Sequence, residues 1–404
     1  MIRLIKKDYF YVFLLFICSL ALFALYLGHP DQLYWDELIH INGARTILYG
    51  NKPYAELTQT PLGREILVAS LYVFGDTPFG ARMLTALSSS LNIVVLFGLG
   101  RLLFKKTAFA LLPPLFLLTD LLFYVQARIG MVDQFLTLFM LLSFYYFLKI
   151  LDDTSALRSY FLVGFYFGLA VAIKSVAIAL LPLYLFFITK NIFQKQISIR
   201  RGFCFYGALI LPSPLIFWFS YGLLGFSFHE MLTHLNWLWG FLSNFQIDPS
   251  ITSDWKDWLL VQKPIWYLFE ELGGNSSKVV LAAGNPFFWL AAEFSFIALL
   301  FFGRSIPKKF FYLHAVIVFQ FLFWSVKPST HIYYMLPVLP FYALLIGALF
   351  WFLWDRFPNK RNIVIGNAIA LWLLSLGFFI YYFPLIQGQV VSNQVLQRYP
   401  NLPP

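Results

Sequence analysis

Carboxylates recur in this sequence close to the ends of long apolar runs. Asp36 and Glu37 stand side by side shortly after the first run, and Asp133 lies in a short turn after a later one. A positioned carboxylate can take the proton that a hydroxyl loses during nucleophilic attack. Ionisable groups at membrane depth are costly, so a recurrent set of them favours a chemical role.

Four cations occupy comparable places, namely Arg64, Arg82, Arg128 and Lys174. Taken singly, each fits a side chain that anchors or pairs at a helix end. Interleaved with the carboxylates, the set predicts transfer of a group from a lipid phosphate, because Arg and Lys stabilise the charge that develops on a leaving phosphate. A monophosphate leaving group needs no metal in principle, and no Asp-x-Asp pair is present. We therefore expect no metal and no cofactor besides the lipid-linked donor.

Two polar side chains and one aromatic side chain further along are candidates for contact with substrate. Lys327 and His331 follow an apolar run, and Trp255 lies in a Trp-rich segment before another. An interfacial histidine and an aromatic belt are the simpler interpretations. The alternatives are contact of His331 with donor or acceptor, and stacking of Trp255 on a sugar.

Two further patterns are weaker signals. His229 and His234 are five residues apart, which separates them by about 140° on a helix, so the zinc motif with two histidines four apart is not met. Asp120 lies within an apolar run, and we expect it to pair with Arg128 or to hydrogen-bond a neighbouring helix.

The composition sets the class of protein that must position these groups. The chain has 404 residues, of which 60% are hydrophobic and 12% charged. A soluble protein usually has about 25% charged residues. Repeated long apolar runs therefore predict an all-α polytopic membrane protein, a single transmembrane domain over residues 1–404 without a soluble domain.

Basic residues gather in six segments between the apolar runs and give the orientation. The net charge is +10, but its clustering follows the positive-inside rule and not the pattern of a nucleic-acid-binding protein. The amino terminus is then inside and the carboxyl terminus outside. We expect about eleven spans, with two short ones meeting near Lys174, at residues 9–28, 78–104, 107–125, 133–150, 159–173, 175–189, 203–226, 286–303, 310–326, 332–354 and 363–384.

The two longest segments between spans, about 29–77 and 227–285, both fall on the outer side in this topology. They contain amphipathic pieces rich in aromatic residues, which suit helices in the interface plane. Residues 36–49 have helical apolar spacing, and Asp36 and Glu37 stand in the first turn, where the helix dipole favours negative charge.

An ordered series of short motifs extends along the chain: YWDE with Asp36 and Glu37, TPLGRE with Arg64, VFGDTPFGARM, ARIGMVD, GLAVAIK, SDWKDWLLVQKP, AAGNPFFW and THIYYMLPVLP. The series resembles the glycosyltransferase-C superfamily, and specifically the protein O-mannosyltransferase family with its bacterial relatives. Thr60 and Arg64 replace a Pro and a Lys of the family pattern, and Ala127 replaces a Ser. The series covers most of the chain, in order.

The resemblance implies roles for single residues. Asp36 matches the catalytic base, Glu37 is expected to bind or orient acceptor or sugar, and Asp133 to orient an active-site partner. The four cations are expected to surround the donor phosphate. The Gly-Asn-Pro motif adds Asn285 as a possible substrate-binding residue.

The resemblance also implies an activity. The chain is expected to transfer mannose or another hexose from a polyprenyl phosphate to an acceptor hydroxyl, with inversion, in protein O-glycosylation. Two alternatives stay open: transfer to a lipid or cell-wall glycan, as in the aminoarabinose transferases, and transport of lipid-linked sugars. We expect a bacterial inner or plasma membrane, an active site on the periplasmic or extracellular face, and membrane lipid, donor and a protein or glycolipid acceptor as partners, with no nucleic acid.

Overall fold

The computed structural model describes residues 2–53, 58–155, 157–244, 248, 251–327 and 330–399, and the structural statements below concern these residues. The helices and strands, in chain order, are α1 (Ile2–Ala24), α2 (Glu37–Leu48), α3 (Leu62–Phe74), α4 (Pro78–Phe104), α5 (Thr107–Leu118), α6 (Leu121–Gln126), α7 (Asp133–Asp152), α8 (Leu157–Ile173), η1 (Ser175–Leu180), α9 (Leu181–Phe193), α10 (Ile199–Ile210), α11 (Pro212–Leu223), α12 (Phe228–Asn244), α13 (Trp255–Leu259), β1 (Ile265–Leu272), β2 (Ser276–Ala282), α14 (Pro286–Phe302), η3 (Gly303–Ser305), α15 (Lys308–Ser325), η4 (Ile332–Met335), α16 (Leu339–Arg356), η5 (Pro358–Lys360), α17 (Arg361–Ile386), β3 (Val390–Ser392) and α18 (Asn393–Leu396).

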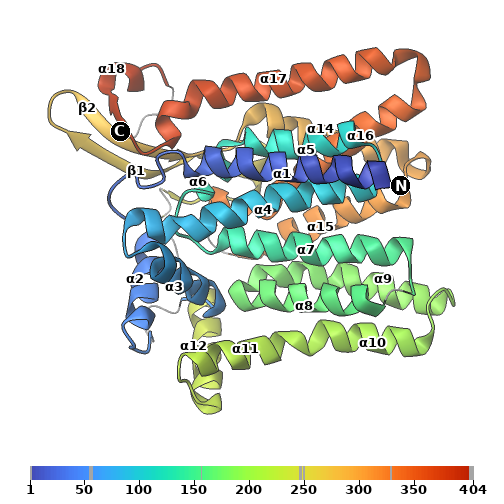
Figure 1. Ribbon diagram of the computed structural model, residues 1–404, viewed down its shortest axis with the longest axis horizontal. Helices are drawn as coiled ribbons and strands as arrows, with labels where there is room; N and C mark the ends of the chain where they lie inside the picture. Colours follow the sequence, from blue (N-terminus) through green and yellow to red (C-terminus); the bar gives the residue numbers. More distant parts are fainter. Residues whose placement is uncertain are drawn as a thin grey trace.

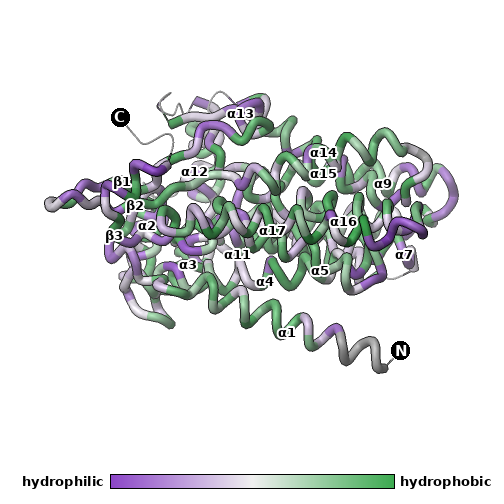
Figure 2. The backbone as a smooth tube through the Cα atoms, turned by 90° about the horizontal axis from the view of Figure 1, so that it is seen from above, coloured by the Kyte–Doolittle hydropathy of each residue, from purple (hydrophilic) through white to green (hydrophobic). Residues whose placement is uncertain are grey.

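The long helices run side by side between two ends of the molecule (Figure 1). One end, called the outer end here, carries α2, α3, α12, the β1–β2 hairpin and α18. The amino terminus lies at the opposite, inner end, with the basic connections between α4 and α5, α9 and α10, and α16 and α17. Figure 2 shows hydrophobic backbone between two more hydrophilic ends. This is the distribution that the positive-inside rule predicts for a multi-pass integral membrane protein.

Six helical segments in the described residues are long and apolar enough to cross a membrane. They are 78–104, 133–152, 175–193, 199–223, 339–356 and 358–386, and shorter apolar helices occupy 8–24, 107–118, 157–173 and 286–302. Each of the eleven expected spans contains helix, so the mostly helical architecture is confirmed. The count of eleven spans stays a prediction, because α15 is not among these segments.

Two interruptions place polar groups at the outer end. Helix α8 ends at Ile173 and η1 begins at Ser175, so two short helices meet at Lys174 as expected. Lys174 has an extended backbone, with φ −156° and ψ 134°. A second break separates α5 from α6, where the Asp120 side chain caps α6 by accepting from the Phe123 amide.

The expectation of helices alone is wrong for one part of the outer end. Residues 265–282 form an antiparallel hairpin, and β3 adds a third strand beside β2. The Gly273-Gly274-Asn275 turn has positive φ at Gly274 and Asn275, which suits a three-residue hairpin loop. The flanking Ile, Trp, Tyr, Val and Leu favour strands. The Gly-Gly-Asn turn is the feature of the sequence that indicates the hairpin.

The expected amphipathic helices are present in both outer segments. Helices α2 and α3 fill much of the first and pack against one another, while α12 and α13 lie in the second. Trp239 of α12 is 76% exposed, as an interfacial aromatic side chain would be. Helix α2 packs against α3, which in turn packs against α4 and α8.

Candidate active site

Asp36 is the residue at which the chain enters α2. It is the N-cap of that helix, but its carboxylate makes no capping bond and is left to act elsewhere. Trp35 directly before it has φ 55°, a conformation that bulky residues rarely adopt and that often marks functional sites. Its ring stacks on Tyr267 of β1, with centroids 4.9 Å apart, so hairpin and α2 are held together beside Asp36.

Glu37 is fully buried and bonded on both carboxylate oxygens. Arg82 donates to it twice, from Nε to Oε1 at 2.8 Å and from Nη2 to Oε2 at 3.0 Å. The amide of Gly130 also donates to Oε1, at 2.9 Å. This bidentate pair fixes α2 to α4 and to the turn before α7, so in this structure Glu37 positions Asp36 and is closed to substrate.

Asp36 faces the segment that precedes α16. The hydroxyl of Tyr333 donates to Asp36 Oδ2 at 2.7 Å. Tyr333 is 3% exposed, and its ring stacks on His331 with centroids 5.2 Å apart. His331 is fixed in turn by a bond from Nδ1 to the carbonyl of Ile251, at 3.0 Å.

A second carboxylate lies in the same cluster. Lys174 Nζ donates to Asp133 Oδ1 at 2.8 Å, and both side chains are largely buried. The same ammonium lies 5.6 Å from the Tyr333 ring centroid and 5.0 Å from that of Tyr334. Tyr333 therefore links Asp36 to the Lys174–Asp133 pair, and the structure brings these predicted residues together at the outer end.

Arg82 and Arg128 lie close by but are engaged with the protein. Besides Glu37, Arg82 donates to the carbonyls of Leu27, Pro30 and Gln32, so all five of its N–H groups are used. Arg128 is 3% exposed and donates to the last carbonyls around α1, those of Phe23, Leu25 and Tyr26. The two arginines therefore hold the segment between α1 and Asp36 in place through its backbone carbonyls.

Arg64 lies in the first turn of α3 and is fully buried. It donates from Nη2 to Thr58 Oγ1 at 3.2 Å. Burial, and then the positive charges of Arg64 and Lys174, hold the pKa of His40 well below its usual range. The positive charges of Arg64 and Lys174 thus both affect His40 in α2.

The other predicted contacts lie in two places. Trp255 and Lys327 line a cleft at the outer end of α15, on the side of His331. Asn285 does not join the cluster: its buried side chain caps α14 and donates to the carbonyls of Thr119 and Ser375. In this structure Asn285 holds helices together.

The sequence is similar to that of known mannosyltransferases. A family model described as dolichyl-phosphate-mannose-protein mannosyltransferase matches residues 58–218. The polyprenol-phosphate-mannose–protein mannosyltransferase of Corynebacterium glutamicum is 21% identical, over 90% of this chain and 84% of that protein. The chain is thus similar in sequence to protein mannosyltransferases. The matched range contains Asp133 and Lys174 and begins after Asp36.

Solved structures show that the chain has the glycosyltransferase-C fold expected from the motifs. The protein O-mannosyltransferase Pmt1-Pmt2 complex of S. cerevisiae, bound to its sugar donor, superposes with a TM-score of 0.82 at 12% identity, over 97% of this chain and 92% of that chain. ArnT from Cupriavidus metallidurans bound to undecaprenyl phosphate gives 0.60 at 15% identity, over 95% and 72%. The fold that the motifs led us to expect is therefore confirmed.

Two weaker sequence signals resolve as structural features of this glycosyltransferase-C fold. Asp120 does not pair with Arg128; it accepts from the amides of Phe123 and Asn285 and from Trp289 Nε1. His234 shares a 2.6 Å hydrogen bond with the Tyr221 hydroxyl. Among the described residues no group of three or more His, Cys, Asp or Glu could hold a metal ion.

Sequence reasoning missed the aromatic side of the site. Tyr333 and Tyr267 surround Asp36, and Gln126 holds Tyr267 by donating to its hydroxyl at 2.6 Å. Tyr333 was visible inside THIYYMLPVLP, but a tyrosine in an apolar run carries no charge signal. Burial lowers the pKa of His331, which favours the neutral form of the ring.

Proposed function

We propose that this protein is a polyprenyl-phosphate-sugar-dependent glycosyltransferase that transfers mannose or another hexose to an acceptor hydroxyl, with inversion. The carrying observation is the cluster in which Tyr333 joins Asp36 to the Lys174–Asp133 pair at one end of the bundle. A half-buried carboxylate beside a buried cation is the arrangement that deprotonation next to a leaving phosphate requires. The names of the relatives support mannose as the sugar.

Asp36 acts as the general base in the proposed step. The acceptor oxygen attacks the anomeric carbon while the carbon–oxygen bond to phosphate breaks. The hydroxyl proton passes to Asp36, and the bonding electrons leave with the polyprenyl phosphate. Tyr333 occupies Oδ2 of Asp36, which leaves Oδ1 to receive the proton. Attack opposite the leaving group inverts the sugar.

Lys174 and Asp133 orient the sugar on the other side of Tyr333. Asp133 Oδ2 is buried without a hydrogen-bond partner in the described residues, while Oδ1 holds Lys174. An unsatisfied buried acceptor is costly, so it favours a donor from outside the chain, and a sugar hydroxyl has that chemistry. In the proposed step the Lys174 charge stabilises the negative charge that develops on the leaving phosphate.

The acceptor and the location complete the proposal. The names of the mannosyltransferase relatives imply protein hydroxyls as the acceptors. ArnT as a structural neighbour keeps transfer to a lipid or cell-wall glycan as the alternative. The outer end is proposed to face the periplasm or the exterior of a bacterial inner or plasma membrane, with residues 1–404 acting as one transmembrane domain.

The test is transfer by the purified protein from synthetic polyprenyl-phosphate mannose. A Ser/Thr-rich peptide and a glycolipid extract serve as competing acceptors, and mass spectrometry reads both products. Mannosylated peptide with inverted stereochemistry supports the proposal. Product on the glycolipid alone supports the alternative, and no product with either acceptor or with other hexosyl donors contradicts the glycosyltransferase.

A further inference from the structure

An indole ring at the inner end of the molecule lies between two cations. Lys106 Nζ is 3.7 Å from the centroid of the Trp354 ring, and Arg361 Cζ is 3.9 Å from the same centroid. Two groups this close to one centroid would touch if they shared a face of the ring, so they occupy opposite faces. The electron-rich faces of an indole attract cations in this way. Trp354, Lys106 and Arg361 are called the inner cluster here.

The inner cluster joins two connections between long helices. Lys106 is the N-cap of α5, directly after α4, and Arg361 is the first residue of α17. Trp354 lies in the last turn of α16, and Phe109 of α5 meets its ring edge to face, with centroids 5.6 Å apart. Figure 1 shows the connection between α16 and α17 at the end of the bundle that carries the amino terminus. The packing of α16 on α5 therefore brings the two connections together.

The cations of the inner cluster are exposed, and within the described residues neither forms an ion pair. Three carboxylates at this end are engaged elsewhere: Asp8 with Arg101, Asp152 with Lys309 and Asp153 with Ser155. Arg361 Nε donates to the Trp354 carbonyl at 3.4 Å, while its two terminal nitrogens make no hydrogen bond in this part of the chain. The indole thus orders two cations without neutralising them.

Asp355 is the carboxylate nearest in sequence to the inner cluster. Its side chain lines a cavity of about 400 Å³ together with Arg356 and residues 305–307 before α15. Trp354, in contrast, faces α5. Asp355 therefore lies on another side of α16 and does not supply the missing negative charge.

An exposed apolar ridge on α17 leads away from Arg361. Ile365, Ile369 and Leu373 follow Arg361 at intervals of four residues, and their exposed fractions are 42%, 49% and 52%. Residues four apart form a continuous ridge on a helix. The helix rises about 18 Å between Arg361 and Leu373. That is slightly more than half of the hydrocarbon thickness of a bilayer, about 30 Å, so the ridge spans one leaflet.

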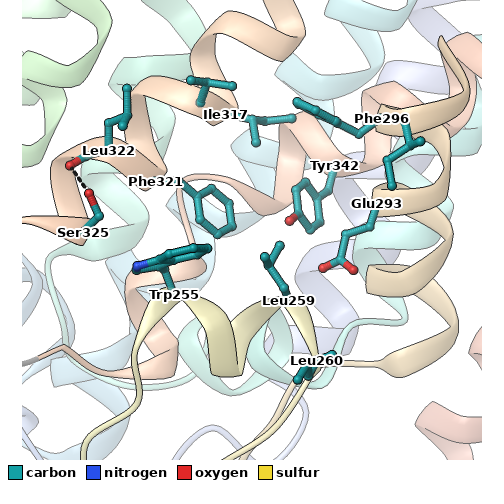
Figure 3. A pocket seen from close by; sticks show the side chains of 12 residues that line it. Trp255, Leu259, Leu260, Glu293, Phe296, Ile317, Phe321, Leu322, Ser325 and Tyr342 are labelled. Carbon is teal, nitrogen blue, oxygen red and sulfur yellow. Dashed lines mark hydrogen bonds between the residues drawn. The ribbon is translucent and has the colours of Figure 1, made fainter. Parts of the chain in front are cut away.

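The apolar groove beside α13 offers no such combination of charge and apolar surface. Its volume is about 510 Å³, and residues of α13, α14, α15 and α16 line it. Glu293 is the charged side chain among the residues labelled in Figure 3, and the described lining contains no cation. An anionic headgroup therefore finds its charge partners at the inner cluster and not in this groove.

We propose that the inner cluster binds the phosphate of an anionic phospholipid from the leaflet at the inner end, with an acyl chain along the α17 ridge. Basic pockets between transmembrane helices on the inner side bind such headgroups. The positive-inside rule explains why cations are numerous at this end. It does not explain why two of them meet on one indole without a carboxylate. The proposal goes beyond sugar transfer and does not depend on it.

The test is lipid binding by the full chain in detergent, measured by native mass spectrometry with added phosphatidylglycerol or phosphatidylcholine. Detergent removes the charged bilayer surface, so a difference in affinity reports on local contacts. The unmodified protein should bind phosphatidylglycerol more tightly. Lys106→Gln combined with Arg361→Gln should weaken that binding about tenfold or more, because hydrogen bonds between charged groups contribute at least this factor. Binding of phosphatidylcholine should stay unchanged.

Two further variants separate the arrangement of the charges from their number. Lys308→Gln removes one exposed cation at the same end but outside the inner cluster, so it should bind phosphatidylglycerol like the unmodified protein. Arg361→Gln alone, with the same change of charge, should bind several-fold more weakly. Trp354→Leu keeps every charge and removes the ring that orders the cations, so it should also weaken binding several-fold. If Trp354→Leu does not fold, the double variant decides alone.

The proposal is overturned if the unmodified protein binds both lipids equally, or if the double variant keeps its affinity for phosphatidylglycerol. Equal losses in Lys308→Gln and Arg361→Gln would also overturn it, because they would indicate a general charge effect. Inorganic phosphate that displaces phosphatidylglycerol at equal concentration would show that the apolar ridge contributes nothing, and the lipid would not be the ligand. Sugar transfer is not measured, so failure of the proposed function would leave the lipid site standing.

Discussion

The hydroxyl of Tyr333 lies 2.7 Å from Asp36 Oδ2, although 297 residues separate the two in sequence. The contact joins the entry of α2 to the short η4 helix that leads into α16. Beside this contact, Trp35 stacks on Tyr267, so the β1–β2 hairpin meets the chain at the start of α2. Asp36 is thereby held on two sides while one oxygen stays available.

Tyr333→Phe removes this hydrogen bond and keeps the ring. Because hydrogen bonds to charged groups contribute about 1.5–3 kcal/mol, kcat should fall about tenfold to a hundredfold. The donor KM should stay nearly constant, since the hydroxyl faces Asp36 and not the lipid. Steady-state kinetics measure the split. The control is Tyr381→Phe, whose hydroxyl bonds the Arg398 carbonyl. Equal kcat in both variants would remove Tyr333 from the mechanism.

Lys174→Gln and Asp133→Asn test the second half of the cluster. Each breaks the 2.8 Å ion pair, and each should lower kcat/KM about tenfold or more. The double variant should lose little more than either single one, because both remove the same unit. Fully additive losses would show that the two side chains act separately.

Arg82→Ala leaves Glu37 charged and buried without its partner. Such a change costs about 3–5 kcal/mol of stability. Glu37→Gln combined with Arg82→Ala should be less destabilising than the sum of both, as a double-mutant cycle of denaturant unfolding in detergent would measure. If Arg82→Ala unfolded at the same denaturant concentration as the unmodified protein, Arg82 would not hold this part of the chain in place.

Glu65 provides a pH-dependent stability. Burial raises the pKa of this α3 carboxyl to about 7, against the opposing bond from Ser220. The folded state therefore holds a proton that the unfolded state releases above about pH 4.5, so stability falls as pH rises from there to about 7. Glu65→Gln should raise Tm at pH 8 and change it little at pH 4. A larger gain at pH 4 would reverse the sign and exclude this explanation.

Charge and hydropathy made much of the architecture predictable. Basic segments alternate with apolar runs, and this alternation predicted where the helices end. The break at Lys174 was predicted because only two short helices there keep the basic segments on one side of the membrane. The β1–β2 hairpin was missed because its pattern is short and lies among aromatic interfacial residues. Local periodicity does not distinguish such a run from an amphipathic helix.

The sequence predicted which charged residues gather at the site, but not which of them form ion pairs and hydrogen bonds with one another. Asp36, Asp133 and Lys174 meet as expected, yet the sequence could not show that Glu37 and Arg82 satisfy one another. Which of two adjacent carboxylates is enclosed depends on α4 and on the turn at Gly130, both distant in sequence. Tyr333 carried no charge to reveal it.

The central claim is that Asp36 is the base of a sugar transfer at the outer end. The most direct measurement compares Asp36→Asn with the unmodified protein in two assays, the rate of sugar transfer and the affinity for polyprenyl phosphate. The rate should fall by about 10²- to 10⁴-fold while the affinity stays the same. Transfer by Asp36→Asn at the unmodified rate would contradict the account.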